Sequence, residues 1–116
     1  MTDELRHALL GLHKSLVDYA KNSYESTHGS VGGPANLFRL LVDDPAFQWL
    51  RPLSETIVAI DEALETEPPA THAAIVAMVR GRLFPETATA FSEGLKKAAQ
   101  DSVQIKEALA ATQTRM

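Results

Sequence analysis

The side chains best suited to binding chemistry lie in and around one central stretch, residues 36–64. That stretch carries the only tryptophan of the chain, together with two arginines. An arginine close to aromatic rings can bind an anionic ligand or a partner's carboxylate, because its planar guanidinium donates paired hydrogen bonds. Four residues are therefore our candidates for binding a ligand or a partner: Tyr24, Trp49, Arg51 and Asp61.

Two interpretations of these candidates stay open. In one, the tyrosine, the tryptophan and Arg51 line a small cleft at one end of the fold that holds an anionic ligand. In the other, Arg51 and Asp61 lie at the edge of the core and form ion pairs with the first helix, for instance through Asp18 and Lys14. In the second interpretation, Arg51 and Asp61 stabilise the fold and do not bind a ligand.

A third interpretation concerns an exposed surface. Trp49 lies off the apolar stripe to which its neighbours Phe47 and Leu50 belong. If Trp49 and either Leu37 or Phe38 are exposed, they form an apolar patch suited to dimerisation or to docking a protein partner. Alternatively, the short helix that contains Leu37 and Phe38 covers the tryptophan.

Metal-binding and catalytic motifs are incomplete in this sequence. A carboxylate-bridged metal site in a helical bundle needs two Glu-x-x-His motifs, and the chain has one, Glu25 to His28. His7 and His13 do not share a helical face. The glycine-rich segment 29–33 lacks the lysine and the strand-to-helix context of a phosphate-binding loop. We predict no metal ligands, no cofactor and no catalytic residues, and leave open whether the chain is an enzyme.

Composition narrows the class of protein. The chain has 116 residues, of which 45% are hydrophobic and 22% charged, so we predict one globular domain over residues 1–116. A formal net charge of −4 disfavours binding to nucleic acid, which requires a concentrated basic surface. The chain has no cysteine, no secretory signal pattern and no apolar run near the roughly 20 residues that span a bilayer. We therefore predict a cytoplasmic protein without membrane contact.

The central stretch itself predicts a long helix with a kink. Its apolar residues are spaced three or four apart, which places them on one helical stripe: Phe47, Leu50, Leu53, Ile57, Ile60 and Leu64. Asp44 followed by Pro45 is typical of a helix start. Pro52 falls inside the stripe, where it removes an N–H and clashes with the preceding turn. We expect a kink or a break there, with the two halves roughly collinear and an arginine or a tyrosine bonded to the carbonyl freed near Gln48.

The rest of the chain also has helical periodicity, and no segment alternates as a strand does. Further helices are expected over residues 3–24, 35–42, 71–83 and 86–111, with turns at 28–34 and 65–70. The last helix carries a heptad-like seam: Phe91, Leu95, Ala98, Ser102, Ile105 and Leu109. We therefore predict an all-α fold, an antiparallel up-down four-helix bundle, with the short helix 35–42 as an additional element packed beneath the longer helices.

The sequence resembles a group of small uncharacterised bacterial helical proteins in three segments. These are residues 12–19 (LHKSLVDY), 24–31 (YESTHGSV) and above all 44–62 (DPAFQWLRPLSETIVAIDE), which contains the pattern DPxFxWLRPLS. The resemblance covers roughly the first half of the chain. That group has no established function, so the resemblance implies a bacterial, cytosolic protein and supplies no catalytic residue.

A helix break that bears an arginine and a tryptophan, without a complete catalytic set, favours a non-enzymatic function. We predict a helical interaction protein that self-associates as a homodimer or docks a protein partner through the end that carries Trp49. The alternative is a small anionic ligand-binding protein or an enzyme that uses Tyr24, Arg51 and Asp61 in a cleft near the Pro52 kink. The exposure of Trp49 and the partners of the two charged residues distinguish these functions.

Overall fold

The structure is a computed structural model and describes residues 2–116. Every regular element in these residues is a helix and none is a strand, so the predicted all-α class is confirmed. The described part of the chain forms seven helices: α1 (Thr2–His28), α2 (Pro34–Asp43), α3 (Pro45–Gln48), α4 (Arg51–Glu65), α5 (His72–Leu83), α6 (Ala90–Asp101) and α7 (Val103–Thr114). Five helices were expected, and two of these are each divided in two.

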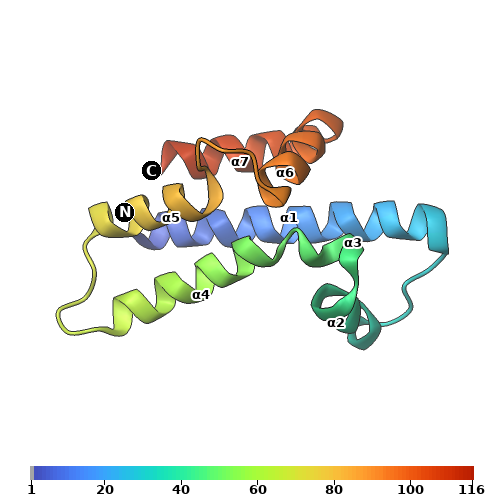
Figure 1. The fold of residues 1–116 in the computed structure, drawn as a ribbon, viewed down its shortest axis with the longest axis horizontal. Coiled ribbons are helices and arrows are strands. Elements are labelled where there is room, and N and C mark those ends of the chain that lie inside the picture. The colour runs from blue at the N-terminus through green and yellow to red at the C-terminus, as the bar shows by residue number, and fades with distance from the viewer. Residues whose placement is uncertain (1) are drawn as a thin grey trace.

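The longest helix, α1, runs along most of the length of the molecule (Figure 1). It confirms the predicted first helix and continues past Tyr24 to His28. Its buried side chains recur every three or four residues: Leu5, Leu9, Leu12, Leu16 and Ala20. Asp3 and Glu4 lie in the first turn, where negative charge interacts favourably with the helix dipole. Neither α1 nor any other helix within residues 2–116 is both long and apolar enough to cross a membrane.

The remaining helices pack on two sides of α1 (Figure 1). On one side, α4 runs antiparallel to α1, with α2 and α3 beyond its start. On the other side, α7 returns along α1 and α6 packs on α7, whereas α5 packs on α4. The start of α1 therefore lies beside the end of α7, at one end of the molecule. The overall dimensions are 47 × 28 × 24 Å, and the long axis follows from the 27 residues of α1.

The apolar stripe of the central stretch is buried as predicted, although the helix is interrupted. Five of its six residues are buried and Leu64 is partly buried. The helix breaks just before Pro52, whose ring would clash with the Gln48 carbonyl in a continuous helix. Trp49 and Leu50 in the break keep right-handed helical angles, with φ of −64° and −82° and ψ of −16° and −14°. The stripe therefore keeps its phase across the break.

The prediction of one continuous helix over residues 86–111 is wrong. Ser102 separates α6 from α7 and has extended backbone angles, φ −135° and ψ 119°. Its side-chain oxygen accepts a hydrogen bond from the Ile105 N–H at 3.4 Å, and its own N–H donates to the Ala98 carbonyl at 2.9 Å. A capped serine thus ends one helix and starts the next, and the apolar seam is divided between the two.

Three other helices, α3, α5 and α6, also start at a side-chain cap, and that of α5 is Thr71, which accepts a hydrogen bond from the Ala74 N–H at 3.2 Å. The Asp44 carboxylate accepts a hydrogen bond from the Ala46 N–H at 2.9 Å, with Pro45 at the first helical position, as predicted. Thr89 and Ser92 accept hydrogen bonds from each other's backbone N–H at 3.1 and 2.7 Å. This reciprocal capping box places the start of α6 after Thr89, later than expected.

Helix α2 lies only partly beneath the longer helices. Leu40 is buried, and Leu37 and Leu41 are partly buried against the core. In contrast, Phe38 is 68% exposed and Val42 is 44% exposed. Residues four apart share a helical face, so these two form an exposed apolar surface, the Phe38/Val42 face. The predicted packing beneath the longer helices is correct for one side of α2 and wrong for this one.

Candidate functional site

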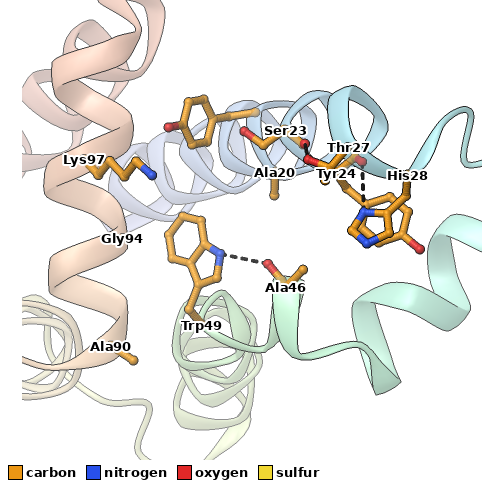
Figure 2. A pocket seen from close by; sticks show the side chains of 11 residues that line it. Ala20, Ser23, Tyr24, Thr27, His28, Ala46, Trp49, Ala90, Gly94 and Lys97 are labelled. Carbon is orange, nitrogen blue, oxygen red and sulfur yellow. Dashed lines mark hydrogen bonds between the residues drawn. The ribbon is translucent and has the colours of Figure 1, made fainter.

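A cavity of about 460 Å³ lies between α1, the turn after α3, and α6 (Figure 2). Its volume is within the range of about 300–1,000 Å³ that is common for small-molecule sites. The side chains that define its character are Tyr24, His28, Trp49 and Lys97, with Ala20 and Ala46 between the aromatic groups. Two of the four candidates from the sequence, Tyr24 and Trp49, are thus brought to one site.

Trp49 is held by α3 and α6. Its indole N–H donates a hydrogen bond to the Ala46 carbonyl at 3.1 Å. Its ring lies against Gly94. A Cβ atom added to Gly94 would lie closer than 3.0 Å to three atoms of the indole ring. The Phe91 ring, three residues earlier on α6, has its centroid 6.3 Å from that of the indole. Trp49 is therefore partly buried by α6, which neither of the two alternatives from the sequence anticipated.

An aromatic pair at the end of α1 lies across the cavity from Trp49 (Figure 2). Tyr24 and His28 are stacked, with ring centroids 4.3 Å apart and an angle of 14° between the planes. Tyr24 also packs against Phe47, with ring centroids 5.6 Å apart. The His28 Nδ1 bonds to the Tyr24 carbonyl at 3.3 Å. These contacts fix the position of the second aromatic wall.

The cavity carries one lysine and no acidic residue. Lys97 extends from α6 toward the space between Trp49 and α1 (Figure 2). Among the described residues that line the cavity there is no aspartate or glutamate. The only ion pair within residues 2–116 joins Arg6 to Asp61, so Lys97 has no carboxylate partner there. The site therefore combines aromatic surfaces with one unpaired positive charge.

Arg51 does not line this cavity. Its Nη2 donates a hydrogen bond to the Val42 carbonyl at 3.4 Å, which joins the start of α4 to the end of α2. The suggested ion pair between Arg51 and Asp18 is therefore wrong. An arginine was expected to bond a carbonyl freed near Gln48, and the carbonyl that Arg51 reaches lies further back along the chain.

Asp61 forms an ion pair with the first helix, as one interpretation proposed, but its partner is Arg6 rather than Lys14. The Arg6 Nε lies 2.5 Å from Asp61 Oδ1, and Nη2 lies 3.2 Å from Oδ2. The hydrogen bond from Arg6 lowers the pKa of Asp61. Arg6 and Tyr24 are separated on α1 by about 27 Å, at 1.5 Å per residue. Asp61 therefore lies far from the cavity and shares no cleft with Tyr24.

Two polar contacts between helices gave no signal in the sequence. His13 Nε2 lies 2.9 Å from the Ser54 hydroxyl between α1 and α4, and burial lowers the pKa of His13. The Tyr19 hydroxyl donates to Asp101 Oδ2 at 2.7 Å, and this bond raises the pKa of Tyr19. The partners are 41 and 82 residues apart in the chain, so only the tertiary structure identifies them.

The single Glu-x-x-His motif has structural partners. Glu25 Oε2 accepts a hydrogen bond from the Val31 N–H at 2.8 Å and so closes the loop after α1. The Asn36 amide donates to the Val31 carbonyl from the other side of the same loop. His28, the second member of the motif, is stacked on Tyr24. No group of three or more His, Asp and Glu residues within residues 2–116 is placed to hold a metal ion.

Comparisons with protein-family models, with curated proteins and with solved structures found no match to this chain. Two features of its own residues support a functional proposal: the cavity beside Trp49, with its aromatic side chains and lysine, and the exposed Phe38/Val42 face of α2. They lie on different elements and can be tested separately.

Proposed function

We propose that this chain is a non-enzymatic interaction protein that self-associates as a homodimer through the Phe38/Val42 face. The observation that carries the proposal is the 68% exposure of Phe38 on a helix whose opposite side is buried. Phenylalanine is enriched at protein interfaces, and an exposed apolar surface of this kind marks a contact site. The contact surface is thus assigned to α2 rather than to Trp49, because α6 packs against the tryptophan.

The Phe38/Val42 face is complementary to itself. Arg39 and Asp43 follow the two apolar residues and both lie on the same flank of the face. In an antiparallel pair of α2 helices related by a two-fold axis, Phe38 of each copy packs on Val42 of the other. The same symmetry brings Arg39 of each copy close to Asp43 of the other. Opposite charges at the rim then favour this orientation over the parallel one.

The expected dimer is weak. Helix α2 has 10 residues, so the contact is at the small end of protein interfaces. We expect a dissociation constant on the order of 10 μM or weaker, as in transient complexes. The association must therefore be followed over a wide range of protein concentrations.

Sedimentation analysis from about 1 μM to about 1 mM protein tests the dimer. We expect the mass of the unmodified chain to rise toward the dimer, and Phe38→Ser to remain a monomer. Val103→Ser is the matched control, because Val103 is 72% exposed on α7. A monomer at every concentration would refute self-association, and a dimer that Phe38→Ser leaves intact would place the interface elsewhere.

A charge exchange tests the orientation. Arg39→Asp places like charges on the rim and should weaken the dimer, whereas the double variant with Asp43→Arg should restore it. Restoration requires that the two positions face each other across the interface. If the double variant is as weak as the single one, the antiparallel arrangement is wrong. If a different protein binds the Phe38/Val42 face and a second copy of this chain does not, the proposed homodimer is wrong.

We further propose that the seven helices form an up-down four-helix bundle in which α6 and α7 together make the fourth limb. The directions of α1, α4, α5 and α7, which alternate along the chain, support this description (Figure 1). A bacterial, cytoplasmic setting is proposed on the resemblance of residues 44–62 to bacterial proteins. The net charge of −4 supports a role without nucleic acid.

A further inference from the structure

We propose that the cavity between α1, α3 and α6 binds a small, flat aromatic carboxylate. This inference goes beyond self-association and uses a surface separate from α2. Trp49 forms one side of the cavity and the Tyr24–His28 pair forms the other, with Lys97 at the rim (Figure 2). Each of these features specifies one property of the ligand.

The aromatic side chains specify a flat, apolar body. Trp49 donates its only N–H to the Ala46 carbonyl, so the indole offers ring surface to the cavity rather than a hydrogen-bond donor. The opposite wall is the stacked pair of Tyr24 and His28. The Ala20 side chain between them is small and apolar. A ring placed between these walls gains stacking contacts that a branched aliphatic group of the same size does not.

The lysine specifies a negative charge on that body. The chain as a whole has a net charge of −4, yet no acidic residue within residues 2–116 lines this cavity. The Lys97 ammonium therefore has no internal partner and can form a charge-assisted hydrogen bond with a carboxylate. A cationic ligand would instead be repelled by the ammonium, and the Asp101 carboxylate one turn further along α6 already accepts a hydrogen bond from Tyr19.

The volume specifies a free small molecule. About 460 Å³ accommodates one or two fused rings with a single carboxylate. The ring lies between Trp49 and Tyr24, and the carboxylate lies toward Lys97. We therefore use 2-naphthoate as the probe. Its amide, 2-naphthamide, has the same rings without the charge, and decahydro-2-naphthoate has the charge and the same carbon skeleton without an aromatic ring.

Because Trp49 is the only tryptophan, its indole N–H gives a single side-chain signal in a proton–nitrogen NMR spectrum. We expect 2-naphthoate to shift this signal in a saturable manner. Both 2-naphthamide and decahydro-2-naphthoate should bind at least about fivefold more weakly, as expected for the loss of about 1 kcal/mol of interaction. Equal binding of all three compounds, or no saturable shift with 2-naphthoate, would overturn the proposal.

Lys97→Met tests the charge, with Lys96→Met as the matched control. Lys96 is the preceding residue on α6 and does not line the cavity. We expect Lys97→Met to weaken the binding of 2-naphthoate about fivefold and to leave the binding of 2-naphthamide unchanged. Lys96→Met should change the binding of neither compound. If Lys97→Met weakens both compounds equally, the lysine acts on the shape of the cavity and the assigned carboxylate contact is wrong. The outcome is independent of whether the chain forms a dimer.

Discussion

The chain interrupts its long helices twice, once before Pro52 and once at Ser102, and the two interruptions differ in backbone geometry. Before Pro52, Trp49 and Leu50 keep helical dihedral angles, whereas Ser102 is extended. A proline removes one hydrogen bond and prevents close stacking of one turn on the next, but it leaves the residues around it helical. A capping serine ends one helix and starts another in a new direction. The first interruption therefore preserves the apolar phase, and the second redirects the chain.

Both interruptions contribute to the cavity. The break before Pro52 places Trp49 in a turn, where its ring reaches Gly94 of α6. The change of direction at Ser102 lets α7 pack along α1 while α6 contributes to the cavity wall. Two helix breaks of different chemical origin thus position the walls of one cavity.

Replacing a core residue just beyond the first break should have the largest effect. Ile60 is fully buried and belongs to the stripe that continues through Pro52. We expect Ile60→Ala to lower the free energy of unfolding by roughly 2–5 kcal/mol, measured by urea denaturation. Val58→Ala on the same helix is the control, since Val58 is 54% exposed. A loss below about 1 kcal/mol for Ile60→Ala would mean that the stripe does not keep its phase.

The contact between the first break and α6 can be tested at Gly94. Gly94→Ala places a methyl group against the Trp49 ring, whereas Gly81→Ala on α5 meets nothing within 4 Å. Both variants gain helix propensity, so their difference isolates the steric effect. We expect Gly94→Ala to be less stable than Gly81→Ala by about 1–3 kcal/mol. Equal stabilities, with unchanged Trp49 fluorescence, would contradict the close approach.

The second break is tested by removing its cap. Ser102→Ala should lower the free energy of unfolding by about 1 kcal/mol, because the Ile105 N–H loses its side-chain acceptor. We expect the corner between α6 and α7 to persist, since α7 stays packed on α1. Backbone chemical shifts at position 102 measure this. A shift to helical values would show that the cap alone maintains the corner.

Replacing Pro52 by alanine tests the break between α3 and α4. Pro52→Ala restores an N–H that can donate to the Gln48 carbonyl, and the residues between them already have helical angles. We therefore expect one continuous helix through this region, in contrast to Ser102→Ala. The free energy of unfolding should change by less than about 1 kcal/mol, because the regained bond opposes the greater entropy of the unfolded chain. An amide at position 52 that exchanges freely with solvent would contradict this expectation.

The smallest expected effect is a dependence on pH at His13, which contacts Ser54 just after the first break. Burial lowers the pKa of His13 below the usual histidine value of 6.5, so the unfolded chain binds a proton more readily than the folded chain. This contribution to stability is complete above pH 6.5 and is lost as pH falls toward the folded pKa. His13→Gln should flatten the fall in the free energy of unfolding between about pH 7.5 and 5.5, measured by urea denaturation at a series of pH values.

The parts of the fold that the sequence predicted correctly depend on local chemistry. The stripe of α1, the start at Asp44 and Pro45, and the break before Pro52 all follow from side-chain periodicity or from the proline ring. The corner at Ser102 does not, because a serine is tolerated inside a helix and also caps one. Which role it takes depends on the packing of α7 against α1, and that contact is not encoded locally.

The candidate site was predictable only in part, for a related reason. Trp49 and Tyr24 could be chosen because large aromatic residues are scarce in this chain. Lys97 could not, because exposed lysines are common and its role depends on α6 lying beside α1. The contact between Gly94 and the Trp49 indole could not be predicted either, because it depends on how α6 packs against the turn after α3. The partner of Asp61 was missed because the register between α4 and α1 is set by the whole interface.

The position of the chain ends has a practical consequence. Helix α1 begins and α7 ends at one end of a molecule that is 47 Å long, whereas the cavity is lined by residues near the other end of α1. An affinity tag or a linker that is joined at the start of α1 or the end of α7 therefore lies far from Trp49. We therefore expect immobilisation through either end to leave α2 and the turn after α3 facing the solution (Figure 1).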